Sequence, residues 1–402
     1  MPSPPPQTIR LTRSITLPDR LRLARYRRLP ELGPRLLFFS GGTALTGLSR
    51  LLVEYTYNSI HLVTPFDSGG SSAALRDAFD MLSVGDLRSR ILALADRSVI
   101  GHPEIYELFA YRLSKTESTE QLQAELASMV SGENTLVAMI PDPMRKIIRN
   151  HLRFFADHMP ASFDLHGASI GNLILAGGYL MNEQHIDPVI FMFSKLIEAR
   201  GVVRPTIGDS LHLAAELEDG QTVIGQRLIT GKEVAPLDSP VSRAFLSSKP
   251  GQVEETVPDA RRKIRELIAQ AEQICFPVGS FYSSIIANLL PRGITEAIAS
   301  NPCPKVYVPN MGDDPEELGL PVHRRVQVLL EYLSQHHDLK PDVSQLLNLV
   351  VVDSRNGAYR GGLDISQINA CGVEVVDCEL VTAESAPGID EERLLEVLLS
   401  VT

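Results

Sequence analysis

Short apolar runs alternate with segments of helical spacing along most of the chain. The run at 36–39 is apolar throughout, and 46–55 follows it with leucines on one helical face. The run at 59–64 repeats this arrangement and leads into a helical segment that begins near Ala73. Buried strands that alternate with helices are typical of a parallel sheet covered on both faces. The pattern therefore predicts an α/β protein with a Rossmann-like, three-layer α/β/α fold and a mainly parallel sheet.

The alternation resumes in the C-terminal part of the chain. Residues 260–273 have the spacing of a charged helix, and apolar runs follow at 274–278, 305–308, 349–352 and 373–376. We predict a strand at each of these runs, because each is short and rich in β-branched or aromatic residues.

Two segments break the alternation. Residues 102–160 are charged and helical, which predicts a helical insertion. Residues 210–217 and 221–229 flank Glu218-Asp219-Gly220, and Asp-Gly between two such stretches predicts a β-hairpin. We expect 36–402 to form one domain that carries both features, with the hairpin at its edge.

The chain is long and acidic. Its 402 residues are 44% hydrophobic, and 38 Lys and Arg against 49 Asp and Glu give a net charge of −11. A chain of this charge is not expected to bind nucleic acid through its overall field. Any bound anion must therefore be met by local donors. No apolar run approaches the ~20 residues of a membrane span.

The cysteines give no sign of a metal site. Cys275, Cys303, Cys371 and Cys378 form no C-x-x-C pair and share no zinc-ligand spacing with histidine. We therefore expect no zinc, and a cytoplasmic protein with reduced thiols.

Residues 1–35 form a separate arm that is rich in arginine and opens with PSPPP. A leader that is rich in arginine and poor in acids is also typical of a transit peptide. Asp19, Glu31 and scattered prolines interrupt an amphipathic helix, so we favour an arm that packs on the body or on a partner subunit. We expect a homo-oligomer, most simply a homodimer.

Three loops share one design, in which a strand is followed by small and hydroxyl residues and then by a helix. They are 40–47, 67–72 and 279–284. In a parallel sheet all three lie at the carboxyl edge, where ligands of open α/β sheets bind. Helix N-termini attract phosphate, and glycine lets an anion approach the backbone. One such loop alone is better explained as a tight turn or helix cap, but three together predict a diphosphate site.

The first loop argues against two common nucleotide sites. From Gly42 it reads G-x-x-x-x-G-L-S, so Leu48 stands where a Walker A loop has lysine. No G-x-G-x-x-G follows the first strand, and we therefore expect no NAD. Residues 167–171 match G-x-S-x-G, but no strong strand precedes them, so a serine hydrolase is not expected.

Asp67, at the end of the second predicted strand, is the main candidate for chemistry. An acid at this position can bond ribose hydroxyls or hold Mg²⁺ beside phosphates. The alternative is a purely structural Asx-turn or helix cap.

Two arginines follow Asp67. Arg76 lies one turn into the next helix, and Asp86 is predicted to be the N-cap of a helix through Ala95. Arg88, close to that cap, could bind a phosphate bidentately. The alternative is a pair of surface ion pairs, Arg76–Asp77 and Asp86–Arg88.

Several stretches of the sequence resemble the CofD-like superfamily. They read GGTALTGLSRLL, VTPFDSGGSSAALRDAFDMLSVGDLRSRILALAD, GNLILA, VGSFYSSIIANLLPRGITEAI and PKVYVPN, and the resemblance runs over about 36–381. The superfamily includes 2-phospho-L-lactate transferase of deazaflavin coenzyme biosynthesis and the YvcK-type gluconeogenesis factors, which bind UDP-sugars. The D-x-G-G-S-S and G-D-x-R elements are nearer to the YvcK-type branch, within an uncharacterised CofD-like subgroup with this longer chain.

The resemblance implies a modified Rossmann fold with a nucleotide diphosphate across the sheet edge, and Asp67 as the acid that faces metal or ligand. Together with the loop pattern it gives these candidate contacts: Gly41, Gly42, Thr43, Ser68, Gly69, Gly70, Ser71, Ser72, Arg76, Asp86, Arg88, Asn172, Gly279, Ser280, Tyr282 and Ser283.

Two positions depart from the family pattern. Ala44-Leu45-Thr46 lengthen the first turn, and Ser68 replaces the second acid of the usual D-D-G-G pair. The second change weakens any metal site that needs both acids. No motif of the transferase's acceptor pocket is found.

We therefore expect a nucleoside-diphosphate-type ligand, such as a UDP-sugar, and a YvcK-like regulatory or assembly role. The alternative is an enzyme similar to 2-phospho-L-lactate transferase, which moves a phosphate-linked group from a nucleoside diphosphate donor. In that case Asp67 is the candidate catalytic residue. Asp67 is also the candidate ligand for Mg²⁺, which would help to meet the phosphate charge during such a transfer.

Overall fold

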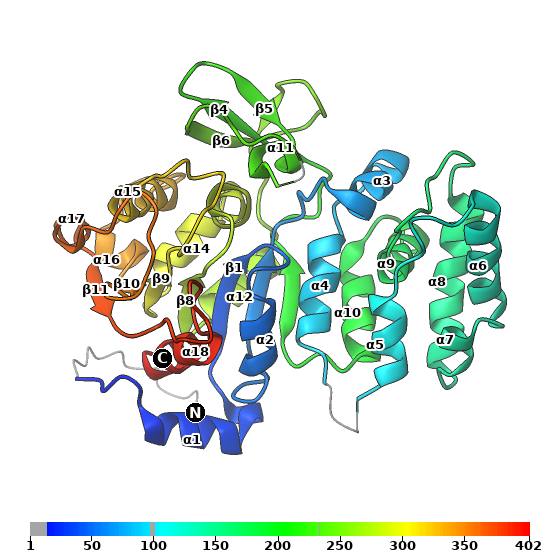
Figure 1. The fold of residues 1–402 in the computed structure, drawn as a ribbon, viewed down its shortest axis with the longest axis horizontal. Helices are drawn as coiled ribbons and strands as arrows, with labels where there is room; N and C mark the ends of the chain where they lie inside the picture. Colours follow the sequence, from blue (N-terminus) through cyan, green and yellow to red (C-terminus); the bar gives the residue numbers. More distant parts are fainter. Residues whose placement is uncertain (1–13, 97–100, 233) are drawn as a thin grey trace, which may run out of the picture.

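A parallel sheet of seven strands lies at the centre of the computed structural model, which describes residues 14–96, 101–232 and 234–402 (Figure 1). The strands, in sheet order, are β11 (Glu374–Asp377), β10 (Leu349–Val352), β9 (Lys305–Tyr307), β8 (Gln273–Phe276), β1 (Leu36–Ser40), β2 (Ile60–Val63) and β3 (Val202–Pro205). The chain runs outward from β1 to β3 and then returns to β8, so the topological switch point lies between β1 and β8. The predicted α/β fold with a mainly parallel sheet is confirmed.

The central strands are buried on both faces, which is why they appear in the sequence as unbroken apolar runs. All five residues of β1 are buried. Successive side chains of a strand point to opposite faces, so Leu37 and Phe39 belong to one core and Leu36 and Phe38 to the other. The rings of Phe39 and Phe276 stack with 5.5 Å between centroids, which joins the two strands at the switch point.

Helices cover both faces of the sheet. Leucines of α2 (Thr46–Leu52) and α18 (Glu391–Ser400) pack in the core of Leu36 and Phe38. The opposite face carries α12 (Arg262–Ala269), a π-helical turn (Phe281–Ile286) that runs into α13 (Ala287–Leu289), α14 (Ile294–Ser300) and α15 (Val322–Leu333). The remaining short helices of this part are η1 (Pro30–Leu32), α16 (Val343–Leu346) and α17 (Ile365–Ala370).

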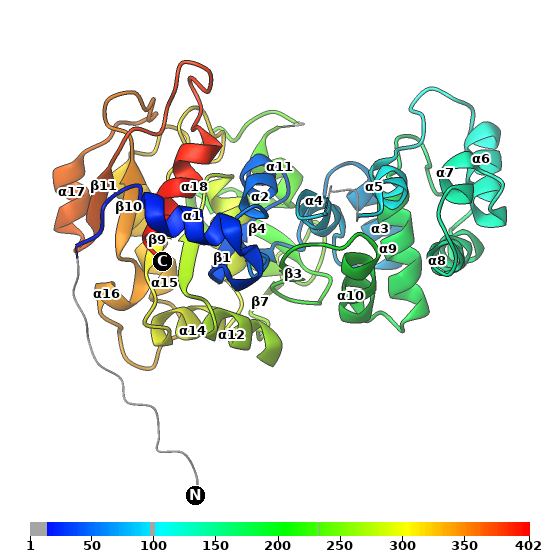
Figure 2. The ribbon, with the colours of Figure 1, turned by 90° about the horizontal axis from the view of Figure 1, so that it is seen from below.

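The described part of the N-terminal segment forms α1 (Arg20–Arg28), which lies against α18 (Figures 1 and 2). Arg22 Nη1 donates to Ser400 O over 2.9 Å, and Asp19 N donates to Ser400 Oγ over 2.8 Å. The two ends of the described chain are therefore held together. Residues 1–13, which include the proline-rich opening, lie outside the described residues.

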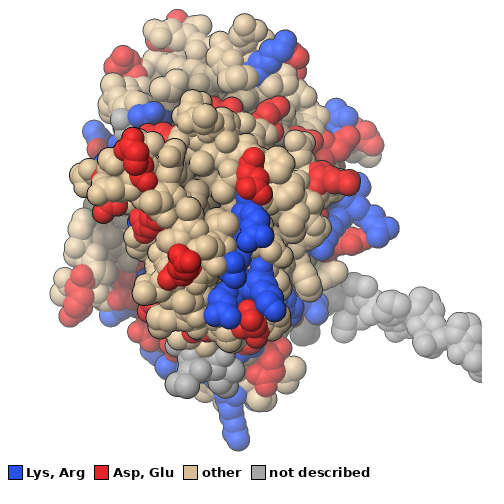
Figure 3. Space-filling model, turned by 90° about the vertical axis from the view of Figure 1, so that its right-hand side faces the viewer, with Lys and Arg blue, Asp and Glu red and all other residues tan. Residues whose placement is uncertain are grey.

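A helical lobe with a core of its own extends beyond β3 (Figure 1). Its helices are α3 (Gly70–Phe79), α4 (Gly85–Ala93), α5 (Pro103–Ala110), α6 (Thr119–Ser131), α7 (Thr135–Ala138), α8 (Met144–His158), α9 (Ile170–Met181) and α10 (Ile186–Leu196). Glycine brings α8 and α9 close together, since a Cβ at Gly177 would lie 2.0 Å from His151 O. Within the described ranges, no helix is both long and apolar enough to cross a bilayer. Figure 3 shows acidic side chains scattered over the outer face of the molecule on this side, with a group of basic side chains in its lower central part.

A second, antiparallel sheet stands above the carboxyl edge of the large one (Figure 1). Its order is β5 (Thr222–Ile224), β4 (His212–Leu217), β6 (Val241–Ser247) and β7 (Glu255–Thr256). The predicted hairpin is present as β4 and β5. Its second strand was predicted too long, because the chain leaves the sheet after Ile224 and forms α11 (Gln226–Thr230). The strands β3, β6 and β7 were not predicted.

The predicted start of α4 was also wrong. The N-cap is Val84, and Asp86 lies inside the first turn of α4. An acid in a first turn still interacts favourably with the helix dipole, which is why the sequence pattern resembles a cap.

The hydroxyl of Tyr332 ties the small sheet to the large domain. It accepts a hydrogen bond from Ala244 N over 2.6 Å, and the Tyr332 side chain is buried. We predict that Tyr332→Phe lowers the free energy of unfolding by about 1–3 kcal/mol, because it leaves a buried N–H of β6 without its partner. Urea denaturation at constant pH measures this. Tyr57→Phe, at a ring that stacks on Arg200, is the matched control, and equal losses in both variants would contradict the assignment.

Candidate functional site

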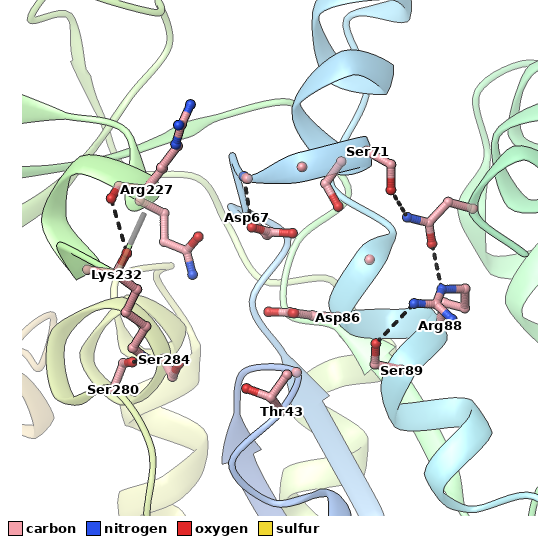
Figure 4. A pocket seen from close by; sticks show the side chains of 18 of the residues that line it. Thr43, Asp67, Ser71, Asp86, Arg88, Ser89, Arg227, Lys232, Ser280 and Ser284 are labelled. Carbon is pink, nitrogen blue, oxygen red and sulfur yellow. Dashed lines mark hydrogen bonds between the residues drawn. The ribbon is translucent and has the colours of Figure 1, made fainter. Parts of the chain in front are cut away.

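A cavity of about 350 Å³ opens at the carboxyl ends of β1 and β2, beneath α11 (Figure 4). It is lined by Gly42, Thr43, Asp67, Gly69, Gly70, Ser71, Ser72, Gly85, Asp86, Arg88, Ser89, Arg112, Asn172, Gln226, Arg227, Thr230, Lys232, Ser280 and Ser284. Most of these residues are small, hydroxylated or charged. The cavity therefore suits a polar ligand that hydrogen bonds to many groups at once.

The second loop brings the start of α3 to the cavity. Gly69 is the N-cap of α3, and Gly70 has a φ of +49°, a conformation that favours glycine. Gly69 to Ser72 line the cavity, so the helix begins with its first-turn backbone amides beside it. Asp67 Oδ1 accepts a hydrogen bond from Gly69 N over 3.0 Å. The Asx-turn interpretation of Asp67 is therefore present in the structure, within the site.

Two side chains of α4 hydrogen bond to the backbone of the first loop, one on each side of it. The buried Arg90 side chain donates to Leu45 O and to Gly41 O, each over 2.9 Å. On the other side, Asp86 accepts a hydrogen bond from the backbone of Gly42. A Cβ at Gly42 would lie 2.1 Å from Asp86 Oδ1, so this position requires glycine. Gly42 and Thr43 line the cavity, whereas the predicted contact Gly41 does not.

Asp86 is the titratable group of greatest interest in the site. Burial raises its pKa to about 7, and the charge of Asp67 acts in the same direction. Arg90 and the Gly42 amide oppose this shift without cancelling it. Two acids close together in a cleft, one of them titrating near neutral pH, are a common signature of functional sites.

The third loop presents hydroxyls to the cavity but not its helix start. Asp314 Oδ2 accepts from Phe281 N over 3.2 Å, and Glu316 Oε2 accepts from Tyr282 N over 2.9 Å and from Ser283 N over 2.8 Å. The backbone amides of the third loop, which were expected to bind a phosphate, are thus already bound to two carboxylates of the chain itself. Neither acid was predicted to belong to the site, because both lie more than thirty residues beyond the third loop in the chain.

The predicted contacts of the third loop divide accordingly. Ser280 lines the cavity, together with Ser284, which was not predicted. Gly279 N donates instead to Asn310 Oδ1, over 2.7 Å. The Tyr282 hydroxyl donates to Val241 O over 3.3 Å, and the side chain is buried away from the cavity.

Among the described residues, four basic side chains line the cavity: Arg88, Arg112, Arg227 and Lys232. Only Arg88 was predicted. Arg112 follows α5, whereas Arg227 and Lys232 come from α11 and the loop after it. Ser68 does not line the cavity, but its hydroxyl accepts from Arg227 N over 2.9 Å and so attaches α11 to the second loop.

The predicted contact Arg76 points away from the cavity. Its guanidinium donates to Phe66 O over 3.0 Å and to Leu211 O over 2.6 Å. Arg76 thus joins the second loop to the small sheet. Arg88 does reach the site, where its Nε donates to Asn172 Oδ1 over 2.8 Å, and Asn172 Nδ2 donates to Ser71 Oγ over 3.0 Å.

The family model described as 2-phospho-L-lactate transferase CofD matches residues 36–381. The chain belongs to the CofD family. The expected family and the stretch it covers are thereby confirmed.

Within the CofD family, the chain is similar to proteins named for gluconeogenesis. A putative gluconeogenesis factor from Thermoanaerobacterium thermosulfurigenes is 28% identical over 386 residues, which cover 92% of this chain and 97% of that protein. The gluconeogenesis factor of Bacillus subtilis is 28% identical over 361 residues, or 87% and 92% of the two chains. This CofD-family chain is therefore similar to the YvcK-type branch over nearly its whole length.

Solved structures support the fold of this CofD-family member. The crystal structure of protein BH3568 from Bacillus halodurans superposes with a TM-score of 0.66 at 23% identity, and covers 91% of this chain and 99% of that one. A second structure of that protein, described as a member of the UPF0052 family, superposes with the same TM-score at 24% identity.

Because the pKa of Asp86 is raised in the folded protein, the free energy of unfolding should depend on pH. The folded-state pKa of about 7 lies above the ordinary value of 3.8, so ionisation favours the unfolded chain. The resulting loss of stability begins near pH 4, grows up to about pH 7 and is constant above. We predict that Asp86→Asn, which keeps an acceptor for Gly42 N–H, stabilises the protein by about 2–3 kcal/mol more at pH 8 than at pH 5.

Chemical denaturation at the two pH values checks this prediction. Asp338→Asn, at an exposed loop position, is the control and should give the same small change at both. If Asp86→Asn changes the free energy of unfolding equally at both pH values, the pKa of Asp86 is not raised in the folded protein.

Proposed function

We propose that the cavity binds a nucleoside-diphosphate-type ligand, with a UDP-sugar as the first candidate, and that the protein has a YvcK-like regulatory or assembly role. The observation that carries this is the combination of the α3 N-terminus with Arg227 and Lys232 at one polar cavity. Backbone amides at a helix start and flexible cations together are a general solution for binding phosphate.

The arrangement of groups suggests where the diphosphate lies. Thr43 and Ser284 border the cavity floor, and Lys232 stands above Ser280, to whose hydroxyl its Nζ donates over 2.9 Å (Figure 4). We place the diphosphate along this wall, beside Gly69 at the start of α3. Lys232 then exchanges a neutral partner for an anionic one, which makes the hydrogen bond stronger.

The two acids fit a divalent cation better than a bare anion. Asp67 and Asp86 both line the cavity, and the charge of Asp67 raises the pKa of Asp86. Mg²⁺ is usually held by one or two carboxylates together with phosphate oxygens of the substrate. Asp86 would thus take the place of the second acid of the family pattern, which is Ser68 in this chain. We propose that Asp67 and Asp86 would hold Mg²⁺ when the diphosphate is bound, where the ion would neutralise phosphate charge.

Transfer of a phosphate-linked group is the second candidate function, and the pKa of Asp86 near 7 is the observation that favours it. A general base works best when its pKa lies near the working pH. An acceptor hydroxyl would attack phosphorus, its proton would pass to Asp86 or Asp67, and the bond from phosphorus to the nucleotide oxygen would break. Release of a nucleotide from UDP-sugar or GDP derivatives in the presence of an acceptor would distinguish this from binding alone.

A thermal-shift panel tests the proposed ligand class. We predict that at least one nucleoside diphosphate or UDP-sugar raises the Tm, and that Lys232→Gln weakens its binding about tenfold by removing a charged hydrogen-bond donor. Arg262→Gln, at an exposed helix position outside the cavity, is the matched control. Stabilisation by NAD alone, or equal weakening in both variants, would refute the proposal.

The metal is tested separately. We predict that Mg²⁺ tightens binding of the nucleotide to the wild type and that Asp67→Asn removes this dependence, because a neutral amide is a poor ligand for Mg²⁺. Isothermal titration with and without the ion measures the effect. If binding to Asp67→Asn still responds to Mg²⁺ as the wild type does, Asp67 is not a metal ligand.

A further inference from the structure

We propose that the wall of the cavity formed by Ser71, Ser89, Arg112 and Asn172 is a second anion subsite, which binds a small oxyanion separate from the nucleotide. The oxyanion is a carboxylate or a phosphate monoester. This inference rests on the proposed function, because it assigns the nucleotide to the opposite wall.

The direction of the hydrogen bonds on this wall can be deduced. Arg88 Nε can only donate, so Asn172 must turn its Oδ1 toward it, and the two atoms lie 2.8 Å apart. Asn172 therefore turns its Nδ2 toward Ser71 Oγ, which accepts this hydrogen bond over 3.0 Å. Since Ser71 already accepts there, its own hydroxyl proton is directed elsewhere. Ser71 lines the cavity, so it acts as a donor to whatever the cavity holds.

Buried packing fixes this chain of hydrogen bonds. Arg88 and Asn172 are only 7% and 1% exposed. Arg88 Nη1 also donates to Phe109 O over 3.2 Å. A Cβ at Gly171 would lie 2.6 Å from Arg88 Cδ, so glycine makes room for the arginine next to Asn172. Arg88 and Asn172 are positioning residues, and the atom they control is the Ser71 hydroxyl.

Two further groups on the wall are also donors. Arg112 Nη1 donates to Gly167 O over 3.1 Å, which anchors the guanidinium while leaving its other N–H groups beside the cavity. Ser89 follows Arg88 on α4, and its Oγ accepts from Arg88 Nη2 over 3.5 Å, so the hydroxyl proton of Ser89 is directed elsewhere. The positive charges of Arg88 and Arg112 lie close enough to repel each other. An anion between the two arginines would relieve their repulsion.

The two acids separate this wall from the other one. In Figure 4, Asp67 and Asp86 lie between the side with Ser71 and Arg88 and the side with Arg227 and Lys232. The two carboxylates divide the basic side chains of the cavity into two groups, Arg88 with Arg112 and Arg227 with Lys232. Two anions, one at each wall, match this division. Together they also use the four cations that line the described part of the cavity.

The chemistry of the wall sets the class of ligand. Ser71, Ser89 and Arg112 can each donate into the cavity, so the wall matches an unprotonated oxygen with several lone pairs. An ammonium group would be repelled by the two arginines, and an alcohol cannot use several donors at once. A carboxylate or a phosphate monoester can.

Isothermal titration of the full chain, saturated with UDP and Mg²⁺, tests the subsite. Inorganic phosphate and L-lactate are the two probes, which distinguish a phosphate from a carboxylate ligand. We expect at least one of them to bind without displacing UDP. Arg112→Gln should weaken that binding at least tenfold and change UDP binding less than twofold.

Asn172→Asp tests the deduced direction of the hydrogen bonds. The new carboxylate still accepts from Arg88 but cannot donate to Ser71, so we expect at least a tenfold loss of oxyanion affinity at unchanged UDP affinity. Arg153→Gln, at an exposed position of α8 outside the cavity, is the control for general charge. Circular dichroism verifies that each variant is folded.

The results separate this inference from the proposed function. Displacement of UDP by the oxyanion, binding of neither probe to the UDP complex, or equal losses in Arg112→Gln and Arg153→Gln would overturn the second subsite. If no nucleotide binds, the proposed function fails, and phosphate is then titrated into the unliganded protein. Loss of that binding in Arg112→Gln and Asn172→Asp, but not in Lys232→Gln, still supports the subsite, and the reverse pattern overturns it.

Discussion

The site depends on hydrogen bonds from two side chains of α4 to the backbone of the loop after β1. Arg90 and Asp86 are four residues apart, so they project from the same side of the helix. The guanidinium binds the carbonyl oxygens of Gly41 and Leu45, and the carboxylate binds the amide of Gly42. A peptide held at both edges by opposite charges cannot rotate. Its orientation, and with it that of Thr43 at the cavity, is fixed before any ligand arrives.

Much of the fold could be predicted because its signals are local. β1, β8 and β10 are buried on both faces and are therefore apolar at nearly every position. The strand β3 was missed because its four residues include Arg204 and Pro205, which are unusual in a strand. α11 was missed because Leu228 and Ile229 extend the apolar pattern of the predicted strand, whereas in the structure Gly225, with a φ of +114°, ends β5.

The site could be predicted only in part, for a related reason. Glycines, serines and acids in turns are recognisable from their neighbours, so the second loop could be named from its own sequence. Asn172 was named from the family resemblance, and the structure has it lining the same cavity. Arg112, Arg227 and Lys232 carry no local mark of function and reach the cavity through the packing of the lobe and the small sheet. The carboxylates of Asp314 and Glu316 are the converse case. They fill a helix start that the local pattern had left open.

The raised pKa of Asp86 couples ligand binding in the cavity to the uptake or release of a proton. Burial raises the pKa of Asp86 to about 7, so this carboxyl group is only partly ionised at neutral pH. An anion arriving without a metal would raise the pKa of Asp86 further and draw a proton in, whereas a divalent cation would expel one. The proton count of a binding event therefore reports the charge of what has entered. The heat of binding would vary with the ionisation enthalpy of the buffer accordingly.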